Sequence, residues 1–186
     1  MVPLRDREVS AEIIDSCRAG DRDAFRVLYD LYKDRVYSVS LYFFHGDETI
    51  AADVTQQVFL KLITTIGQYK GDAAFSTWLY RLVVNACQDA ARRRKKTAHS
   101  SRVEDLVVAC SQEENWARAE TSRLVRDAVS SLPAKFRMAV LLRYFNDLSY
   151  EEMAAVLRCS MGTVASRLSR GHKMLAERLK SIRSGR

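Results

Sequence analysis

Apolar side chains recur at spacings of three and four residues along most of the chain, which is the period of an amphipathic helix. In the first half this pattern predicts three long helices, the first two beginning after Asp21 and Asp47. The third is expected to be capped by Ser76 and to end in the basic run 92–96. Aspartate and serine favour helix starts because their side-chain oxygens accept hydrogen bonds from free backbone N–H groups. A short helix over 11–19 is expected to come before these three.

The periodicity fades between residues 97 and 116 and then resumes. Further helices are expected over 117–131 and 134–145, with Pro133 at the break, because proline suits the start of a helix. Two prolines and seven glycines in 186 residues leave few obligatory breaks. We therefore expect an all-α protein of two small helical domains, 1–96 and 117–186, joined by a flexible linker over 97–116.

The stretch "SYEEMAAVLRCSMGTVASRLSRG" predicts two helices joined by a tight turn. Ser149 and Glu152 form a capping box, and Ser160 is placed to cap the second helix. In a helix-turn-helix, the second helix enters the major groove of DNA. Its outward face is expected to carry Thr163, Ser166, Arg167, Arg170 and Lys173. An ordinary helical hairpin is the alternative. Arg158 occupies the turn, where glycine would adopt a left-handed conformation more easily.

The net charge of +7 is concentrated in the C-terminal part of the chain. Residues 119–186 hold 13 basic and 6 acidic side chains, whereas residues 1–96 hold 15 and 13. A basic segment suits a polyanionic partner because each neutralised phosphate releases condensed counterions. A solvated basic face is the alternative.

Cysteines and histidines are scattered along the chain. Cys17, Cys87, Cys110 and Cys159 form no C-x-x-C pair, so we expect neither a disulfide framework nor a metal site. The N-terminus lacks the apolar run of a signal peptide, and no stretch approaches 18 consecutive apolar residues. We therefore expect a cytoplasmic protein that is not inserted in a membrane and that needs no cofactor.

The stretch "DVTQQVFLKL" carries a partner-binding pattern. Its polar residues and one leucine share one side of the predicted helix, at spacings of three and four: Asp53, Gln56, Gln57 and Leu60. Amides beside an apolar side chain suit a partner helix, because a solvated face normally uses lysine and glutamate. A solvated face remains the alternative.

The stretch from 69 to 96 combines aromatic and basic side chains. Tyr69, Phe75 and Trp78 surround a loop that contains glycine, and Asn85, Asp89 and Arg92 follow along one helix. Aromatic rings for unstacked bases and cations for the backbone are what single-stranded nucleic acid requires. The alternatives are that the aromatic residues belong to the core and that the basic run complements a helix dipole.

Three motifs together resemble one protein family. "ADVTQQVFLKL", "FSTWLYRLVVNACQDAARRRK" and "LSYEEMAAVLRCSMGTVASRLSRGHKML" resemble the extracytoplasmic-function sigma factors of bacterial RNA polymerase, over most of residues 20–180. The resemblance implies a region two that docks on the β′ clamp helices of core RNA polymerase and opens the minus-ten promoter element. It also implies a region four that reads the minus-thirty-five element as duplex DNA and touches the β flap. Many such proteins are held silent by an anti-sigma factor, which is therefore an expected partner.

The resemblance assigns roles to particular residues. The docking helix matches at Asp53, Gln56, Gln57, Phe59 and Leu60. The loop 67–76 matches the segment that captures a flipped base. Minus-ten contacts are expected from Tyr69, Phe75, Trp78, Asn85, Asp89, Arg92 and Arg93. Minus-thirty-five contacts are expected from Thr163, Ser166, Arg167, Arg170 and Lys173. The chain departs from the family at Ala52, where an acid is usual, and at His172, where arginine is common.

Three functions are compatible with these patterns. The first is an initiation factor with no catalytic residue of its own. The second is a stand-alone helix-turn-helix regulator with an N-terminal dimerisation or sensing domain, which would form dimers and bind palindromic sites. The third is a recombinase-like enzyme, but its candidate nucleophiles, Ser38, Ser40 and Tyr42, have no base beside them in the sequence.

Overall fold

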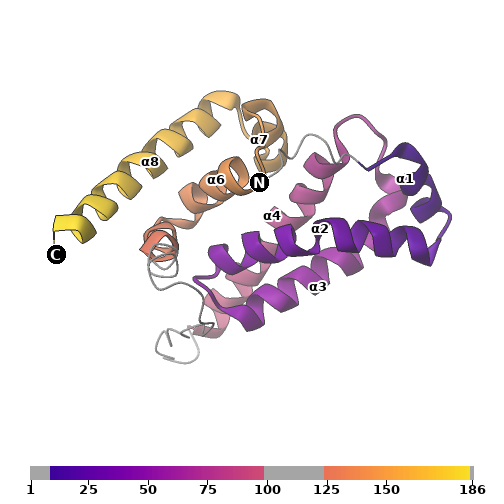
Figure 1. The fold of residues 1–186 in the computed structure, drawn as a ribbon, viewed down its shortest axis with the longest axis horizontal. Helices are drawn as coiled ribbons and strands as arrows, with labels where there is room; N and C mark the ends of the chain where they lie inside the picture. The colour runs from indigo at the N-terminus through magenta and orange to yellow at the C-terminus, as the bar shows by residue number, and fades with distance from the viewer. Residues whose placement is uncertain (1–8, 99–123, 185–186) are drawn as a thin grey trace.

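The computed structural model describes residues 9–98 and 124–184, and every regular element in these ranges is a helix. This confirms the all-α prediction. A helical segment over 124–130 precedes α6. The predicted linker over 97–116 lies outside the described residues, apart from its first two residues, which end α4. The elements are α1 (Ala11–Arg18), α2 (Arg22–Phe43), α3 (Glu48–Thr65), η2 (Ile66–Gln68), α4 (Phe75–Ala98), α6 (Ala134–Phe145), α7 (Tyr150–Leu157) and α8 (Met161–Ser184) (Figure 1).

Most helix starts are where capping residues predict them. The Asp21 carboxylate accepts from the backbone N–H of Asp23 at 2.8 Å, and Asp47 caps α3 in the same way. The cap predicted at Ser76 is wrong, because α4 begins at Phe75 and Ser76 lies in its first turn. The side chain of Phe75 is buried and packs against Tyr32. This core packing favours a helix that includes Phe75 over one that starts after Ser76.

The core of the first half lies between α2, α3 and α4, with α1 against α2 and η2. The apolar face of each helix is buried, for example at Leu28 of α2, Leu62 of α3 and Leu79 of α4. Burying a side chain of this size contributes about 1.5–3 kcal/mol to stability. The three-helix bundle is therefore stabilised mainly by the periodic apolar positions that predict it.

The second half packs α6, α7 and α8 around Met153, Val164 and Leu168. Helices α6 and α8 pack closely at Gly171. A Cβ atom added there would lie 3.1 Å from Cγ2 of Val140. A side chain at this position would therefore require Val140 to shift by a few tenths of an ångström.

The two halves contact each other along a seam. Helix α6 packs against α2, and α7 packs against α4 (Figure 1). In the second contact, Nε of Arg81 donates to the carbonyl oxygen of Ala155 at 3.0 Å. In the first, the rings of Tyr42 and Phe145 lie 4.7 Å apart. Because α2 covers one side of α6 and α8 another, the seven consecutive residues 136–142 are all buried.

A buried arginine bridges the two halves in this seam. Arg137 is 6% exposed, and its guanidinium donates to the carbonyl oxygens of Phe43, Ser130 and Leu132. It also lies 2.9 Å from Nε2 of His45. Burial lowers the pKa of Arg137 to about 10. The carbonyl oxygens at the ends of α2 and of the 124–130 segment therefore hold one cation between the two halves.

Candidate partner- and nucleic-acid-binding surfaces

An apolar groove runs over the surface between α2 and α3, with a volume of about 370 Å³. Leu60 and Ile63 of α3 are 57% and 51% exposed along it, and Tyr29 of α2 faces them. The ring of Phe59 lies beneath, 4.8 Å from that of Tyr29. Exposed apolar side chains that are contiguous in this way mark interaction sites.

The predicted docking residues divide between two surfaces. Gln56, Phe59 and Leu60 line the groove. Asp53 and Gln57 are exposed on the same helix but lie outside its lining. Oε1 of Gln57 accepts from a guanidinium N–H of Arg93 at 2.9 Å. One residue predicted to bind polymerase and one predicted to bind DNA are therefore bonded to each other across α3 and α4.

The aromatic residues around the loop before α4 differ in exposure. Phe75 is only 4% exposed, whereas Tyr69 and Trp78 are half-buried. The three rings lie against one another with centroids 5.5–5.8 Å apart. Phe75 is therefore a core residue with one edge towards the loop, and the other two rings are accessible in part.

The polar stripe on α4 faces solvent. Asn85, Asp89 and Arg92 are all exposed, and Arg92 pairs with Asp89 one turn away. Such a surface ion pair contributes little, about 0–1 kcal/mol, so the guanidinium is easily released to a phosphate. Arg94 lies 3.8 Å from the carboxylate of Asp47 at the start of α3. The stripe and the basic end of α4 together form an exposed surface with mixed charge and a cationic end.

The capping hydrogen bonds predicted for the helix-turn-helix are present in the structure. Ser149 and Glu152 make both bonds of the capping box, and the Ser160 hydroxyl accepts from the backbone N–H of Thr163 at 3.2 Å. The turn residue Arg158 has a φ of 50°, which is left-handed. The hydroxyl of Thr163 also lies 3.0 Å from that of Ser160, so it takes part in the cap.

The other recognition-helix residues differ in how far they reach solvent. Ser166, Arg170 and Lys173 are exposed, and Arg167 is half-buried. One turn further, Nε2 of His172 lies 2.9 Å from the hydroxyl of Tyr144 on α6. This pairing was not predicted, because no sequence pattern links two residues on different helices.

Other kinds of site find little support. Ser40 is buried, and its hydroxyl donates to the carbonyl oxygen of Val36, so it is not placed as a nucleophile. Within 9–98 and 124–184, no three histidine, cysteine or acidic side chains are grouped as metal ligands would be. None of the helices in the described part of the chain has the length and apolarity needed to cross a bilayer.

Comparison with known proteins identifies both halves of the chain. The family model "Sigma-70 region 2" matches residues 28–97, and "Sigma-70, region 4" matches residues 122–175. The RNA polymerase sigma-H factor of Pseudomonas aeruginosa is 32% identical over 187 residues, covering 95% of this chain and 96% of that protein. The ECF RNA polymerase sigma-E factor of Escherichia coli K12 is 33% identical over 182 residues, covering 91% and 94%.

Two solved structures share the fold. CnrH in complex with the cytosolic domain of CnrY aligns with a TM-score of 0.69 at 23% identity, over 91% of this chain and 96% of that one. The sigma factor RpoE in complex with the anti-sigma factor NepR from Bartonella quintana aligns with a TM-score of 0.71 at 23% identity, over 84% and 96%. Since its relatives match it along nearly its whole length, the chain belongs to the extracytoplasmic-function sigma factors of bacterial RNA polymerase, which direct promoter-specific transcription.

Proposed function

We propose that this chain binds core RNA polymerase and selects promoters for it in the cytoplasm, without a catalytic site of its own. Residues 1–96 dock on the polymerase and hold the opened minus-ten strand. Residues 117–186 read the minus-thirty-five element as duplex, and residues 97–116 join them. The observation that carries the proposal is one chain with an apolar groove on α2 and α3, a polar and basic stripe on α4, and a capped helix-turn-helix.

The groove is the proposed polymerase-docking site on the β′ clamp helices. An amphipathic helix that lays its apolar face into such a groove is a common mode of recognition. Leu60 and Ile63 supply exposed apolar area, and Gln56 supplies an amide beside it. Asp34 and Lys33, which is paired with Asp30, also line the groove and carry charges of opposite sign.

The DNA-binding surfaces lie on α4 and α8. Asn85, Asp89, Arg92 and Arg93 face the minus-ten strand in this proposal, with Tyr69 and Trp78 offering rings for unstacked bases. On α8, Arg167 and Arg170 are the side chains suited to bidentate pairing with guanine, each good pair giving about 1–3 kcal/mol of discrimination. The remaining groups on α8 supply phosphate contacts.

The distance between the two promoter elements requires the halves to separate. Their names place them about 25 base pairs apart, which is about 85 Å at about 3.4 Å per base pair. Helices α4 and α7 are in direct contact in this structure, so the two halves cannot reach both elements together in this arrangement. Binding to polymerase must therefore open the seam.

An anti-sigma factor is the second proposed partner. Two of the solved proteins that share this fold are described in complexes with CnrY and with the anti-sigma factor NepR. A partner of this class would act here by covering the groove or by holding the seam closed. The β flap is the proposed contact of the second half on polymerase.

The test of the function is transcription with purified core polymerase on fragmented genomic DNA, with the 5′ ends of the transcripts mapped. New start sites that share two upstream motifs, and that are absent with core alone, are the expected result. A protein that adds no start site but binds palindromic duplex as a dimer would instead be a stand-alone regulator.

The docking site is tested with Gln56→Ala and Leu60→Ala in one variant, and Thr64→Ala as the control on the same helix. Thr64 is exposed but lies outside the groove. The double variant is expected to bind core polymerase about tenfold or more weakly, as for truncation of an interface anchor. Fluorescence anisotropy with labelled protein measures it. Equal affinities of both variants for core polymerase would remove the groove from the interface.

A further inference from the structure

A cavity of about 300 Å³ lies where α1, α2 and the loop before α4 meet. Its size is at the lower end of the range for small-ligand pockets, roughly 300–1,000 Å³. Residues from three separate elements line it, together with Gly71, Ala73 and Ala74 of the loop. Ile14 of α1, Tyr32 of α2, and Tyr69 and Phe75 at the two ends of the loop are among the lining residues.

The cavity has the chemistry of a nucleobase pocket. Proteins hold an extruded base by stacking against aromatic or apolar side chains and by hydrogen bonds to the edge of the base. Half-buried Tyr69 supplies the accessible ring, beside the buried rings of Tyr32 and Phe75, and the backbone of the loop supplies donors and acceptors. Gly71 in this loop has a φ of 83°, which keeps the backbone tightly turned beside the cavity.

The conformation of the loop depends on Tyr69. The hydroxyl of Tyr69 donates to the carbonyl oxygen of Ala73 at 2.7 Å, which closes the loop on itself. Its ring packs edge-on against Phe75 and is tilted against Trp78. The position of Tyr69 therefore sets both the shape of the loop and one wall of the cavity.

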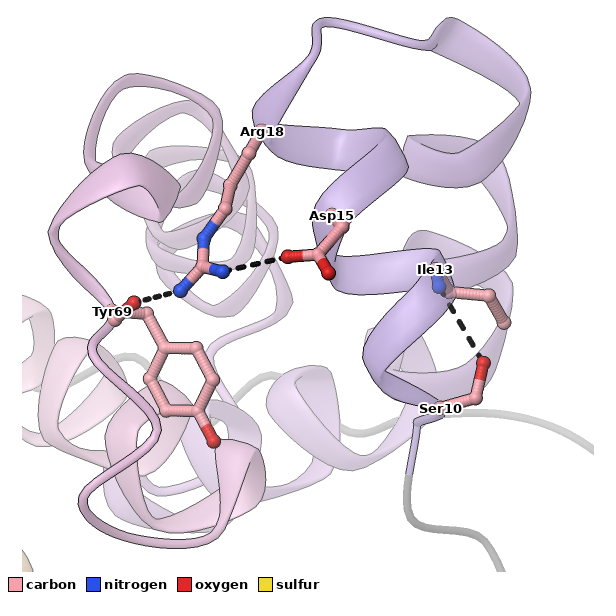
Figure 2. Close-up of polar contacts among 5 residues, drawn as sticks. All are labelled: Ser10, Ile13, Asp15, Arg18 and Tyr69. Carbon is pink, nitrogen blue, oxygen red and sulfur yellow. Dashed lines mark hydrogen bonds and ion pairs between the residues drawn. The ribbon is translucent and has the colours of Figure 1, made fainter.

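Helix α1 fixes Tyr69 through one arginine. The guanidinium of Arg18 donates to the backbone carbonyl oxygen of Tyr69 and lies 5.8 Å from the centre of the Tyr69 ring (Figure 2). Its other nitrogen is 2.7 Å from the carboxylate of Asp15, one turn earlier on α1. Ser10 caps α1, and Ile14 and Cys17 anchor the helix in the core. The Arg18 side chain is thus oriented by its ion pair with Asp15 while it bonds to the loop at Tyr69.

We infer that α1 is part of the site that captures a base of the opened strand, and that Arg18 is its positioning residue. The inference rests on the proposed function and deepens it. Helix α1 lies before residue 28, where the match to the region-two family model begins, so the match itself gives α1 no role. The ligand is one unstacked nucleobase of single-stranded DNA. Arg18 orders the loop that receives it and does not need to touch the base.

The experiment uses the full chain bound to core polymerase, on a promoter found by start-site mapping. Each non-template nucleotide of the minus-ten element is replaced in turn by an abasic one, and the stability of the open complex is measured. The position with the largest loss is taken as the captured base. Absence of any such position would overturn the inference, because no base would then occupy the cavity.

Arg18→Ala is then compared on the intact and abasic promoters. On the intact promoter the open complex is expected to weaken by about tenfold, part of the contribution of one stacked base. On the promoter that is abasic at the captured position, the same variant is expected to have no further effect. A loss of equal size on both promoters would overturn the inference, since it would show a general effect on folding or charge.

Two further variants separate position from charge and fold. Arg22→Ala removes the same charge from an exposed position at the start of α2 and is expected to leave the open complex unchanged on both promoters. Tyr69→Phe keeps the ring and removes the hydroxyl that bonds to Ala73, and the resulting loss of open-complex stability is also expected to vanish on the abasic promoter. If Arg22→Ala matches Arg18→Ala, the inference fails. If the unmodified protein opens no promoter at all, it is the proposed function that fails.

Discussion

Arg158 shows how a single residue can be strained by the turn that it occupies. It ends α7 with φ 50° and ψ 51°, in the left-handed region, which is unfavourable for residues that have a Cβ atom. The sequence predicts this strain, because a two-helix motif with a tight turn needs such a residue and arginine stands in the place of glycine. The structure bears out the conformation.

Arg158→Gly is therefore expected to raise the free energy of unfolding by about 0.5–1 kcal/mol, the left-handed strain less the greater freedom of glycine when unfolded. Chemical denaturation of the full chain measures it. Arg158→Ala keeps the Cβ and serves as the control, with little change expected. A gain of equal size in both variants would show that the arginine side chain, and not the backbone, is unfavourable.

The buried cysteines should be inert in the folded protein. Burial raises the pKa of the Cys87 thiol to about 12 and also raises that of Cys17. At pH 8 a thiol with a pKa of about 12 is ionised in only about one molecule in ten thousand, and the thiolate is the reactive form. Half-buried Cys159 is expected to react with iodoacetamide well before the other two.

Peptide mapping by mass spectrometry after timed alkylation measures this order. Denaturant is expected to abolish the difference, because unfolding returns both raised pKa values towards that of a free thiol. Rapid alkylation of Cys87 in the folded protein would mean that α4 opens locally.

At the scale of elements, periodicity and capping residues predict most of this fold. Asp21, Asp47 and Ser149 begin helices where expected, because a cap is a local interaction between neighbours in sequence. Ser76 misleads because the burial of Phe75, through contacts with a distant helix, outweighs the local preference for serine at a helix start. The roles predicted for the surface residues on α3, α4 and α8 stay predictions until they are tested in binding.

Helices α6 and α8 cross with little space to spare at Gly171. A methyl group there would meet Val140 at 3.1 Å and Cβ of Phe136 at 3.7 Å. Gly171→Ala is therefore expected to destabilise the protein by up to about 2 kcal/mol, which is the overpacking cost of about 1–3 kcal/mol less a gain of about 1 kcal/mol in helix propensity. Thermal unfolding followed by circular dichroism measures it.

Gly162 on the same helix is the matched control, because a Cβ added there would lie no closer than 3.9 Å to the nearest atom, the Ser160 hydroxyl oxygen. Gly162→Ala is expected to be neutral or to stabilise by up to about 1 kcal/mol, since alanine favours helix. Equal melting temperatures for the two variants would mean that α6 and α8 can move apart at little cost.

At the scale of the whole molecule, the seam is what the sequence does not reveal. Arg81 and Ala155 are far apart in the chain, and nothing in the local pattern of either predicts that they meet. The same holds for Arg137, whose burial between two helix ends no local pattern predicts. Contacts of this kind depend on how helices that are distant in the sequence pack against each other, and hydrophobic periodicity within one helix does not predict them.

Arg81→Glu is expected to open the seam, because a carboxylate would face the carbonyl oxygen of Ala155. The unmodified protein should have a radius of gyration close to that of a compact chain of its length, about 16 Å, and the variant a larger one. Small-angle X-ray scattering measures both. Arg22→Glu changes the charge equally away from the seam and should scatter like the unmodified protein. A profile of Arg81→Glu identical to that of the control would show that this contact does not hold the halves.

The burial of α6 on several sides has a thermodynamic consequence. If only the open form binds polymerase at both promoter elements, the closed form acts as an internal competitor, and the apparent affinity falls by the fraction of molecules that are open. Substitutions in the seam, far from the polymerase-binding groove, would then strengthen holoenzyme assembly. Natural variation at Tyr42, Arg81 or Phe145 could thus set how strongly one sigma factor competes with others for a limited pool of core enzyme.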